Sequence, residues 1–145
     1  MLPDVEYDRP TANGELRYKW THKHHGGGKS DDSRWAEDLS IHEEFGVFDE
    51  AVGRAVAVKG HFYGVMRQGK RLRTLGTWDQ QVAKFPRTLP PHPWHGYPVY
   101  PVVSSAPQCH QGDVNKPSNA VFELMAESGM ISETQKQRLK SGRHL

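Results

Sequence analysis

The sequence has very little cysteine and no long apolar run. Its one cysteine, Cys109, excludes an internal disulfide framework and is typical of a protein in a reducing cytoplasm. No stretch approaches the ~20 apolar residues that a membrane-spanning helix needs. The N-terminus is charged and lacks the apolar segment of a signal peptide. We therefore expect a cytoplasmic protein that does not contact a membrane.

Apolar residues are also scarce, at 35% of the 145 residues, which is low for a globular chain. Four Trp, five Tyr and five Phe offset this shortage, because each large ring buries about 150–250 Å². Ten Pro and 14 Gly favour many loops. The length fits a single domain over residues 1–145, with a small aromatic core. Such compactness is typical of small bacterial or phage-like proteins.

Charge is distributed very unevenly along the chain. Residues 31–50 carry eight acids and one base, a net charge of −7, and residues 51–87 carry eight bases and one acid, a net charge of +7. The whole chain carries only +2. Clustered positive charge attracts phosphates and steers them at long range. This separation favours a polyanionic ligand, but the two blocks could also pair with each other.

Two stretches predict β-strands. Leu16, Tyr18 and Trp20 alternate with basic residues, which is the period of a strand with one buried face. Residues 52–75 predict strands on both sides of Gly69, which takes the positive-φ position of a tight turn. We expect an α+β fold: a small antiparallel sheet with a central β-hairpin, long Pro/Gly-rich loops and a C-terminal helical hairpin.

Helices are predicted in two places and left open in a third. Residues 34–48 fit either a helix or an extended segment. Residues 78–85 have apolar residues at helical spacing behind a threonine cap, and predict a short helix. The helical hairpin covers residues 118–145, with Gly129 stopping its first helix and Ser132 capping its second.

The rest of the chain is expected to be loop. Residues 1–15 form an irregular arm, 21–33 a flexible Gly/His loop and 86–117 a Pro/aromatic loop region. Prolines exclude a regular helix or a central strand there. The Gly-Lys-Ser at 28–30 lacks the earlier glycine and the buried strand of a phosphate-binding P-loop, which excludes a nucleoside triphosphatase of that type.

Two basic elements are candidates for contacting nucleic acid. The hairpin contributes Arg67, Lys70, Arg71 and Arg73, and the last helix contributes Lys136, Arg138 and Lys140. A protruding basic hairpin can lie along a phosphate backbone. Residues 123–145 loosely resemble a helix-turn-helix, and are similar to short helical hairpins that form oligomer contacts. The leading hypothesis is a small nucleic-acid-binding or accessory protein, with the C-terminal helices as a contact for a homodimer.

A second hypothesis is a histidine-dependent nuclease, such as a toxin-like ribonuclease. It needs one histidine as base, one as acid, and a cation for the phosphorane charge. The candidates are His25, His61, His95 and His110, and spacing selects none of them. No Cys-x-x-Cys or His-Glu-x-x-His motif is present. We expect neither a metal site nor a cofactor.

A third hypothesis is an interaction or inhibitor protein. The acidic segment 31–50 would bind a basic partner, while Trp94, Tyr97 and Tyr100 would supply rigid aromatic anchors. The alternative for Trp94 is that it covers the hydrophobic core. Partners therefore remain open between nucleic acid and an acidic or basic protein, and the sequence fixes no reaction.

Overall fold

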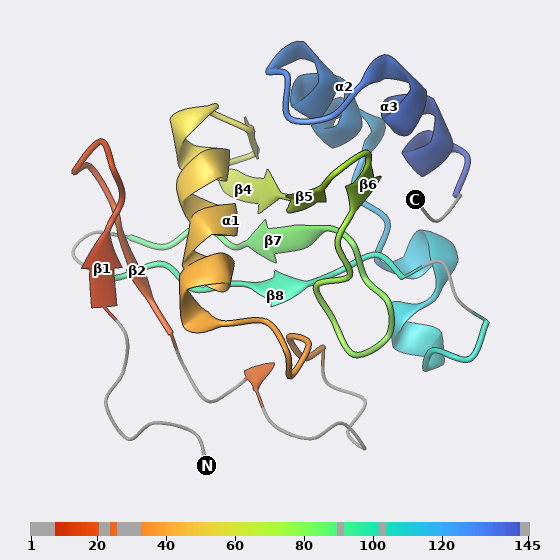
Figure 1. Ribbon diagram of the computed structural model, residues 1–145, viewed down its shortest axis with the longest axis horizontal. Coiled ribbons are helices and arrows are strands. Elements are labelled where there is room, and N and C mark those ends of the chain that lie inside the picture. The colour runs from red at the N-terminus through yellow and green to blue at the C-terminus, as the bar shows by residue number, and fades with distance from the viewer. Residues whose placement is uncertain (1–7, 21–23, 26–32, 90–91, 102–103, 143–145) are drawn as a thin grey trace.

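A computed structural model of the chain describes residues 8–20, 24–25, 33–89, 92–101 and 104–142 (Figure 1). Most of the Gly/His loop expected over 21–33, including Lys29, lies outside these residues, as do the first seven residues of the expected arm. The elements are β1 (Asp8–Pro10), β2 (Arg17–Lys19), α1 (Ile41–Gly53), β3 (Ala57–Val58), β4 (His61–Gly64), β5 (Arg67–Gln68), β6 (Arg71–Leu72), β7 (Ala83–Phe85), β8 (Tyr97–Pro98), the 3₁₀ turns η2 (Gln108–His110) and η3 (Gly112–Val114), α2 (Asn119–Glu127) and α3 (Glu133–Lys140). The expected α+β class is confirmed.

An antiparallel sheet in the order β3-β4-β7-β8 lies at the centre of the molecule. Phe62 of β4 pairs with Phe85 of β7. The ring of Phe48 on α1 packs 6.0 Å from Phe62 and 5.0 Å from Phe85, measured between centroids. Helix α1 therefore covers this face, and Figure 1 shows it crossing in front of the sheet. Because strand side chains alternate, Tyr63 and Lys84 belong to the opposite face.

Helix α1 occupies residues 41–48 of the region 34–48 that the sequence left ambiguous, while residues 34–40 before it are not helical. It starts with a capping box, in which the Ser40 hydroxyl accepts from the Glu43 N–H and the Glu43 carboxylate accepts from the Ser40 N–H. The helix then buries Phe48 completely and extends through Val52. The strand predicted from Val52 onward is therefore wrong for its first two residues, which belong to α1. Val52 is still part of the buried face of that helix.

The short helix predicted over 78–85 is also wrong, since its last three residues form β7, paired with β4 on one side and β8 on the other. The residues before it make a tight turn, in which Asp79 has a φ of 60° and the Leu75 N–H donates to the Gln80 carbonyl over 2.6 Å. Val82 and Phe85 are fully buried, as a helix would also require. Pairing with two neighbouring strands decided the outcome, which three apolar positions cannot reveal.

Two tight turns connect neighbouring strands. The predicted turn between β5 and β6 is confirmed: Gly69 has a φ of 64° and Lys70 does not have a positive φ, which fits a type II′ turn. Between β3 and β4, Lys59 and Gly60 both have positive φ, 54° and 83°, which fits a type I′ turn. The β5–β6 ladder stands beside the central sheet as a separate ladder.

The proline-rich segment runs along one edge of the sheet. Pro98 lies in β8, at the end of the strand order, where its missing N–H removes no bond to a further strand. Trp94 turns inward and is 8% exposed, packing against Phe48 and Phe62 with centroid distances of 5.9 and 5.2 Å. This segment therefore closes the aromatic core between the sheet and α1.

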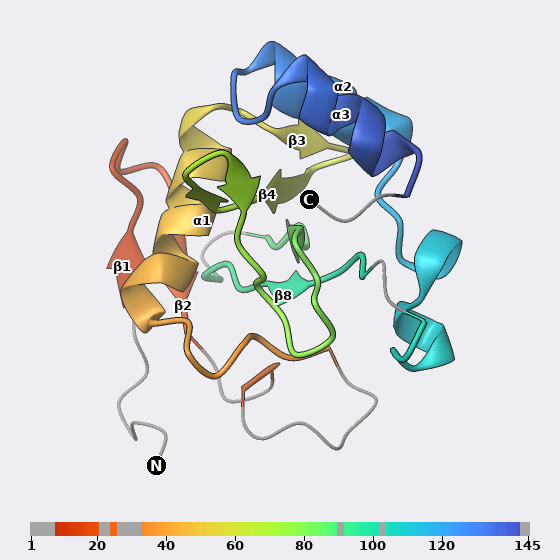
Figure 2. The same cartoon turned by 45° about the vertical axis from the view of Figure 1, so that its right-hand side comes forward.

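The C-terminal helical hairpin is confirmed. After α2 the chain turns at Gly129, which has a φ of 81°, and Ser132 and Gln135 form the capping box of α3. The two helices pack side by side in both views (Figure 2). Met125 and Leu139 are buried in the same core cluster as Val56. The helical pair thus completes the core at one end of the sheet.

Candidate nucleic-acid interface

The middle of the basic hairpin region is joined to the acidic region by ion pairs. Nη1 of Arg73 lies 2.5 Å from Oε2 of Glu43, and Nη2 lies 3.4 Å from Oδ1 of Asp38. The pKa of Glu43 is lowered by the backbone N–H and hydroxyl of Ser40 and by the Arg73 charge. The Arg73 side chain is only 15% exposed. It is held by the fold and could contact a phosphate only by giving up these partners.

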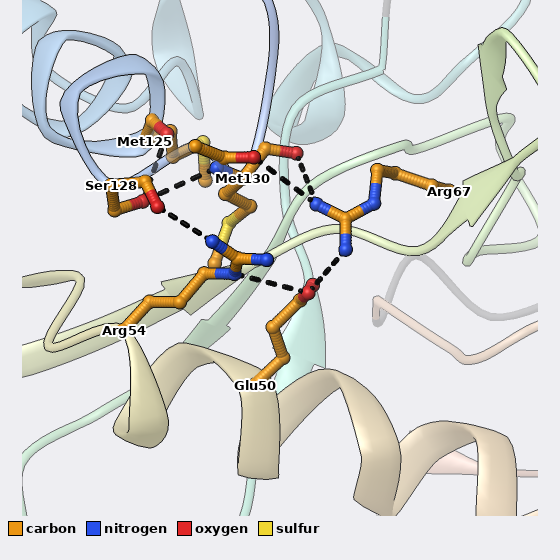
Figure 3. Close-up of polar contacts among 7 residues, drawn as sticks. Glu50, Arg54, Arg67, Met125, Ser128 and Met130 are labelled. Carbon is orange, nitrogen blue, oxygen red and sulfur yellow. Dashed lines mark hydrogen bonds and ion pairs between the residues drawn. The ribbon is translucent and has the colours of Figure 1, made fainter.

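Arg54 and Arg67 converge on the carboxylate of Glu50 (Figure 3). Oε2 of Glu50 lies 3.2 Å from Nε of Arg54 and 2.6 Å from Nη2 of Arg67. Each guanidinium also donates to the turn after α2, Arg54 to the Ser128 carbonyl over 2.6 Å and Arg67 to the Met130 carbonyl over 2.9 Å. Carbonyls at a helix C-terminus attract cations. The two arginines therefore fasten the α2–α3 turn to α1.

Two of the predicted cations of the last helix are paired as well. Nζ of Lys136 lies 2.6 Å from Oε2 of Glu133 and 3.2 Å from Oε2 of Glu123, and Lys140 also donates to Glu123. Hydrogen bonds to Glu133 and Glu123 raise the pKa of Lys136, and those from Lys140 and Lys136 lower the pKa of Glu123. These pairs connect α3 to α2.

Three of the seven predicted nucleic-acid-binding residues remain, namely Lys70, Arg71 and Arg138. All three are exposed, and none forms an ion pair with any residue that the structure describes. Nε2 of Gln135 donates to the backbone carbonyl of Lys70 over 3.3 Å. Because Arg138 follows Gln135 by three residues, both lie on the same side of α3. The two basic elements are therefore neighbours in the fold.

A groove lies where these two elements meet. Its volume is about 490 Å³. It is lined by Arg67, Gly69, Lys70, Gly129, Met130, Ile131, Ser132 and Gln135. No carboxylate is among these lining residues. One wall is formed by Lys70 and Arg67, whose guanidinium is paired with Glu50, and the other is the start of α3, whose dipole favours anions.

The four candidate histidines lie on different elements. Nε2 of His25, before the Gly-rich loop, lies 2.5 Å from Oε1 of the buried Glu44, which also accepts from the Tyr18 hydroxyl. Burial, and then Glu44, raises the pKa of Tyr18 well above its usual value. His95 is exposed ahead of β8, and His110 is buried in η2.

His61, at the start of β4, is held in one tautomer. Its Nδ1 accepts from the backbone N–H of Arg87 over 2.9 Å. A neutral ring with Nδ1 accepting carries its proton on Nε2, which can then only donate. Burial, together with the charges of Lys84 and Arg87, lowers the pKa of His61. His61 is therefore suited to donating a hydrogen bond, and not to accepting a proton through Nε2.

The aromatic residues predicted to anchor a partner are placed differently from one another. Trp94 and Tyr100 are 8% and 3% exposed and belong to the core. Tyr97 of β8 is partly exposed, and with Lys84 and Tyr63 it forms a row across the sheet. No pattern in the sequence indicates this row, because its members are far apart in the chain and only strand register brings them together. Asn115 and Lys116 face the same row across a cavity.

Within the described ranges, no group of His, Cys, Asp and Glu side chains could hold a metal ion. No helix among the described residues is both long and apolar enough to cross a membrane. Comparisons of the chain with family models, with curated proteins and with solved structures found no match. The functional inference therefore depends on the geometry of these surfaces.

Proposed function

We propose that the chain binds nucleic acid at and around the groove between the β5–β6 turn and α3. The phosphate contacts are Lys70, which lines the groove, Arg71, which follows it in the chain, and Arg138, one turn after Gln135 on α3. The observation that carries this proposal is the hydrogen bond from Gln135 to the Lys70 carbonyl, because it joins basic elements 65 residues apart in the chain. Three cations without internal carboxylate partners among the described residues are available to neutralise phosphates there.

The ion pairs formed by the other basic residues support this choice of contacts. Arg67, Arg73, Lys136 and Lys140 are engaged by Glu50, Glu43, Glu123 and their neighbours. A paired cation gains little from a phosphate, since it must first lose its carboxylate. The proposed interface is consequently smaller than the charge pattern suggests, and we expect weak, salt-sensitive binding without base specificity.

The two alternative functions have less support. An interaction protein that uses its acidic segment would need free carboxylates, and three of the eight acids there, Glu43, Glu44 and Glu50, are engaged within the fold. A nuclease would need two histidines close enough to act on the same substrate, and the four candidates come from separate elements. In addition, Nδ1 of His61 accepts a hydrogen bond, so Nε2 carries the proton of the neutral ring and can only donate.

The test is fluorescence anisotropy with a labelled single strand of about 20 nucleotides and the matching duplex, over about 50–200 mM salt. The variant K70Q/R71Q keeps the backbone contact to Gln135 and removes two charges. The charge-matched control is K59Q/R87Q, which removes two exposed cations outside the groove. We expect the slope of log affinity against log salt to fall by about 1.4–1.8 only in K70Q/R71Q.

Adding R138Q should lower the slope by a further ~0.7–0.9. Thermal melting of each variant separates lost binding from lost folding. Unchanged affinity and slope in K70Q/R71Q/R138Q would overturn the proposal. An equal loss of affinity in K70Q/R71Q and K59Q/R87Q would also overturn the proposal, because binding would then depend on overall charge and not on the groove.

A further inference from the structure

The face of the central sheet opposite α1 carries a row of polar side chains. Tyr63 of β4 pairs with Lys84 of β7, and Lys84 pairs with Tyr97 of β8. Residues directly opposite each other on paired strands have Cβ atoms about 4.5–5.5 Å apart and share one face. The row therefore places Lys84 between Tyr63 and Tyr97 on one face of the sheet.

A cavity of about 160 Å³ lies over this row. Its opposite wall is the connection from η3 to α2, which contributes Asn115 and Lys116, and Val99 is among its apolar lining residues. It shares no lining residue with the groove described above. Figure 1 shows the 3₁₀ segment, in cyan, beyond the end of β8. The cavity thus joins two parts of the chain that each supply a lysine.

The cavity is positively charged. Neither Lys84 nor Lys116 forms an ion pair with a described residue, and no side chain described in the lining is a carboxylate. His61 next to the row has a lowered pKa because of burial and the charges of Lys84 and Arg87. Burial is the main cause of that lowered pKa, and the smaller contribution of Lys84 and Arg87 is consistent with positive charge at this end of the sheet, because a nearby like charge disfavours the protonated ring.

Several lining groups are fixed before any ligand enters. The Tyr97 ring stacks on His24, with centroids 4.9 Å apart and an interplanar angle of 32°. Lys116 donates to the Lys140 carbonyl and Asn115 to the Cys109 carbonyl. An ammonium has three N–H donors, so Lys116 keeps two for a ligand. Groups held in this way lose little conformational entropy on binding.

The two phenols are donors at neutral pH. Burial raises the pKa of Tyr63 and of Tyr97, so both hydroxyls keep their protons. Two hydroxyl donors and two ammonium groups match an anion with a charge near −2 and at least three acceptor oxygens. A phosphate monoester meets both conditions, with about −1.5 to −2 charges and three terminal oxygens, whereas a carboxylate offers one charge and two oxygens.

We infer that this cavity binds a phosphate monoester, with Lys84 and Lys116 neutralising the phosphate and Tyr63 and Tyr97 donating hydrogen bonds to it. Val99 and its apolar neighbours contact the carbon body of the ligand. The same chemistry is presented by a free mononucleotide and by the 5′-phosphate end of a nucleic-acid strand. The inference is independent of the groove, because the two sites have no residue in common.

The test is isothermal titration calorimetry of the whole chain at about 50 mM salt, where surface charges are weakly screened. The probes are inorganic phosphate, ribose 5-phosphate, AMP and adenosine. Two short oligonucleotides, with a 5′-phosphate and with a 5′-hydroxyl, distinguish the strand end from the free nucleotide. The expected result is binding of the three phosphates and none of adenosine, with tighter binding of the phosphorylated oligonucleotide if the strand end is the source.

The variants are K84Q, K116Q and Y97F, on two different walls, and the control is K59Q, an exposed cation outside the cavity. Y97F keeps the ring that stacks on His24 and removes only the hydroxyl. Each of the three should weaken AMP binding about tenfold or more, since charged hydrogen bonds are lost, and K59Q should not.

Three results would overturn the inference. One is no heat and no protection from thermal unfolding at about 10 mM of any phosphate probe. Another is AMP binding that K84Q, K116Q and Y97F all leave unchanged. The third is loss of AMP binding in K70Q/R71Q alone, which would move the phosphate to the groove and leave the proposed nucleic-acid interface standing.

Discussion

Nη1 of Arg73 lies 2.5 Å from Oε2 of Glu43, so the centre of the basic block is bonded directly to the first turn of α1. This ion pair joins two side chains 30 residues apart, one from the acidic block of the chain and one from the basic block. The same carboxylate accepts the backbone N–H of Ser40 and caps the helix. Glu43 therefore has two structural partners, which a substitution can separate.

We predict that Glu43 and Arg73 are energetically coupled. E43Q keeps an acceptor for the capping box, because Gln also serves at that position, but it removes the charge that faces Arg73. A double-mutant cycle of E43Q and R73M should give a coupling energy of about 0.5–1 kcal/mol, since Arg73 is largely buried but Glu43 is partly exposed to solvent. Urea unfolding at pH 7 measures it. A coupling near zero would contradict the pairing.

We predict that His61 makes stability depend on pH. Its folded-state pKa is lowered by burial and by Lys84 and Arg87, so the unfolded chain takes up the proton first as pH falls. The stability is fully present above the unfolded pKa of about 6.5 and is lost as pH falls through the folded value. The control H61N keeps an acceptor for the Arg87 N–H. Urea unfolding between about pH 7.5 and 5 should show a flatter profile for H61N; parallel profiles would rule out this role.

We predict opposite effects of alanine at two glycines. A Cβ on Gly96 would lie 2.2 Å from Cδ1 of Phe85 and 2.7 Å from the Lys84 carbonyl, so G96A should lose about 1–3 kcal/mol or more of unfolding free energy. Gly46 in α1 has nothing within 4 Å of that position. G46A should gain about 0.5–1 kcal/mol, because alanine is the better helix former. Thermal melting compares the two, and equal shifts would contradict the packing around β7 and β8.

Local signals in the sequence were sufficient where one residue type decides the backbone. Gly69 marks the β5–β6 turn because only a residue without Cβ takes its positive φ at no cost. Gly129 and Ser132 mark the end of α2 and the start of α3 for similar reasons. These signals predicted the hairpin and the helical pair without any knowledge of their neighbours.

Long-range pairing decided what the sequence could not. Val82 and Phe85 are buried whether their segment is a helix or a strand, so their spacing could not identify β7. Its identity comes from β4 and β8, which pair with it from other parts of the chain. The same holds for the row of Tyr63, Lys84 and Tyr97, which exists only in the final strand register.

The candidate site was predictable only in part. Composition indicated that the hairpin and the last helix were both basic, but it could not show which cations would meet a carboxylate. Glu50 reaches Arg67 across 17 positions, while Lys70 and Arg71 in the same hairpin have no ion pair among the described residues. The net charge of residues 51–87 therefore overstated the number of cations that are open to a ligand.

The core cluster that contains Val56 has a consequence for synthesis of the chain. Met125, Met130 and Leu139 belong to that cluster, and they are made after the strand residues that they cover. During translation part of the apolar surface of the central strands stays uncovered until α2 and α3 have left the ribosome. A chain that stalls before residue 118 would expose this surface and would be prone to aggregate or to be degraded.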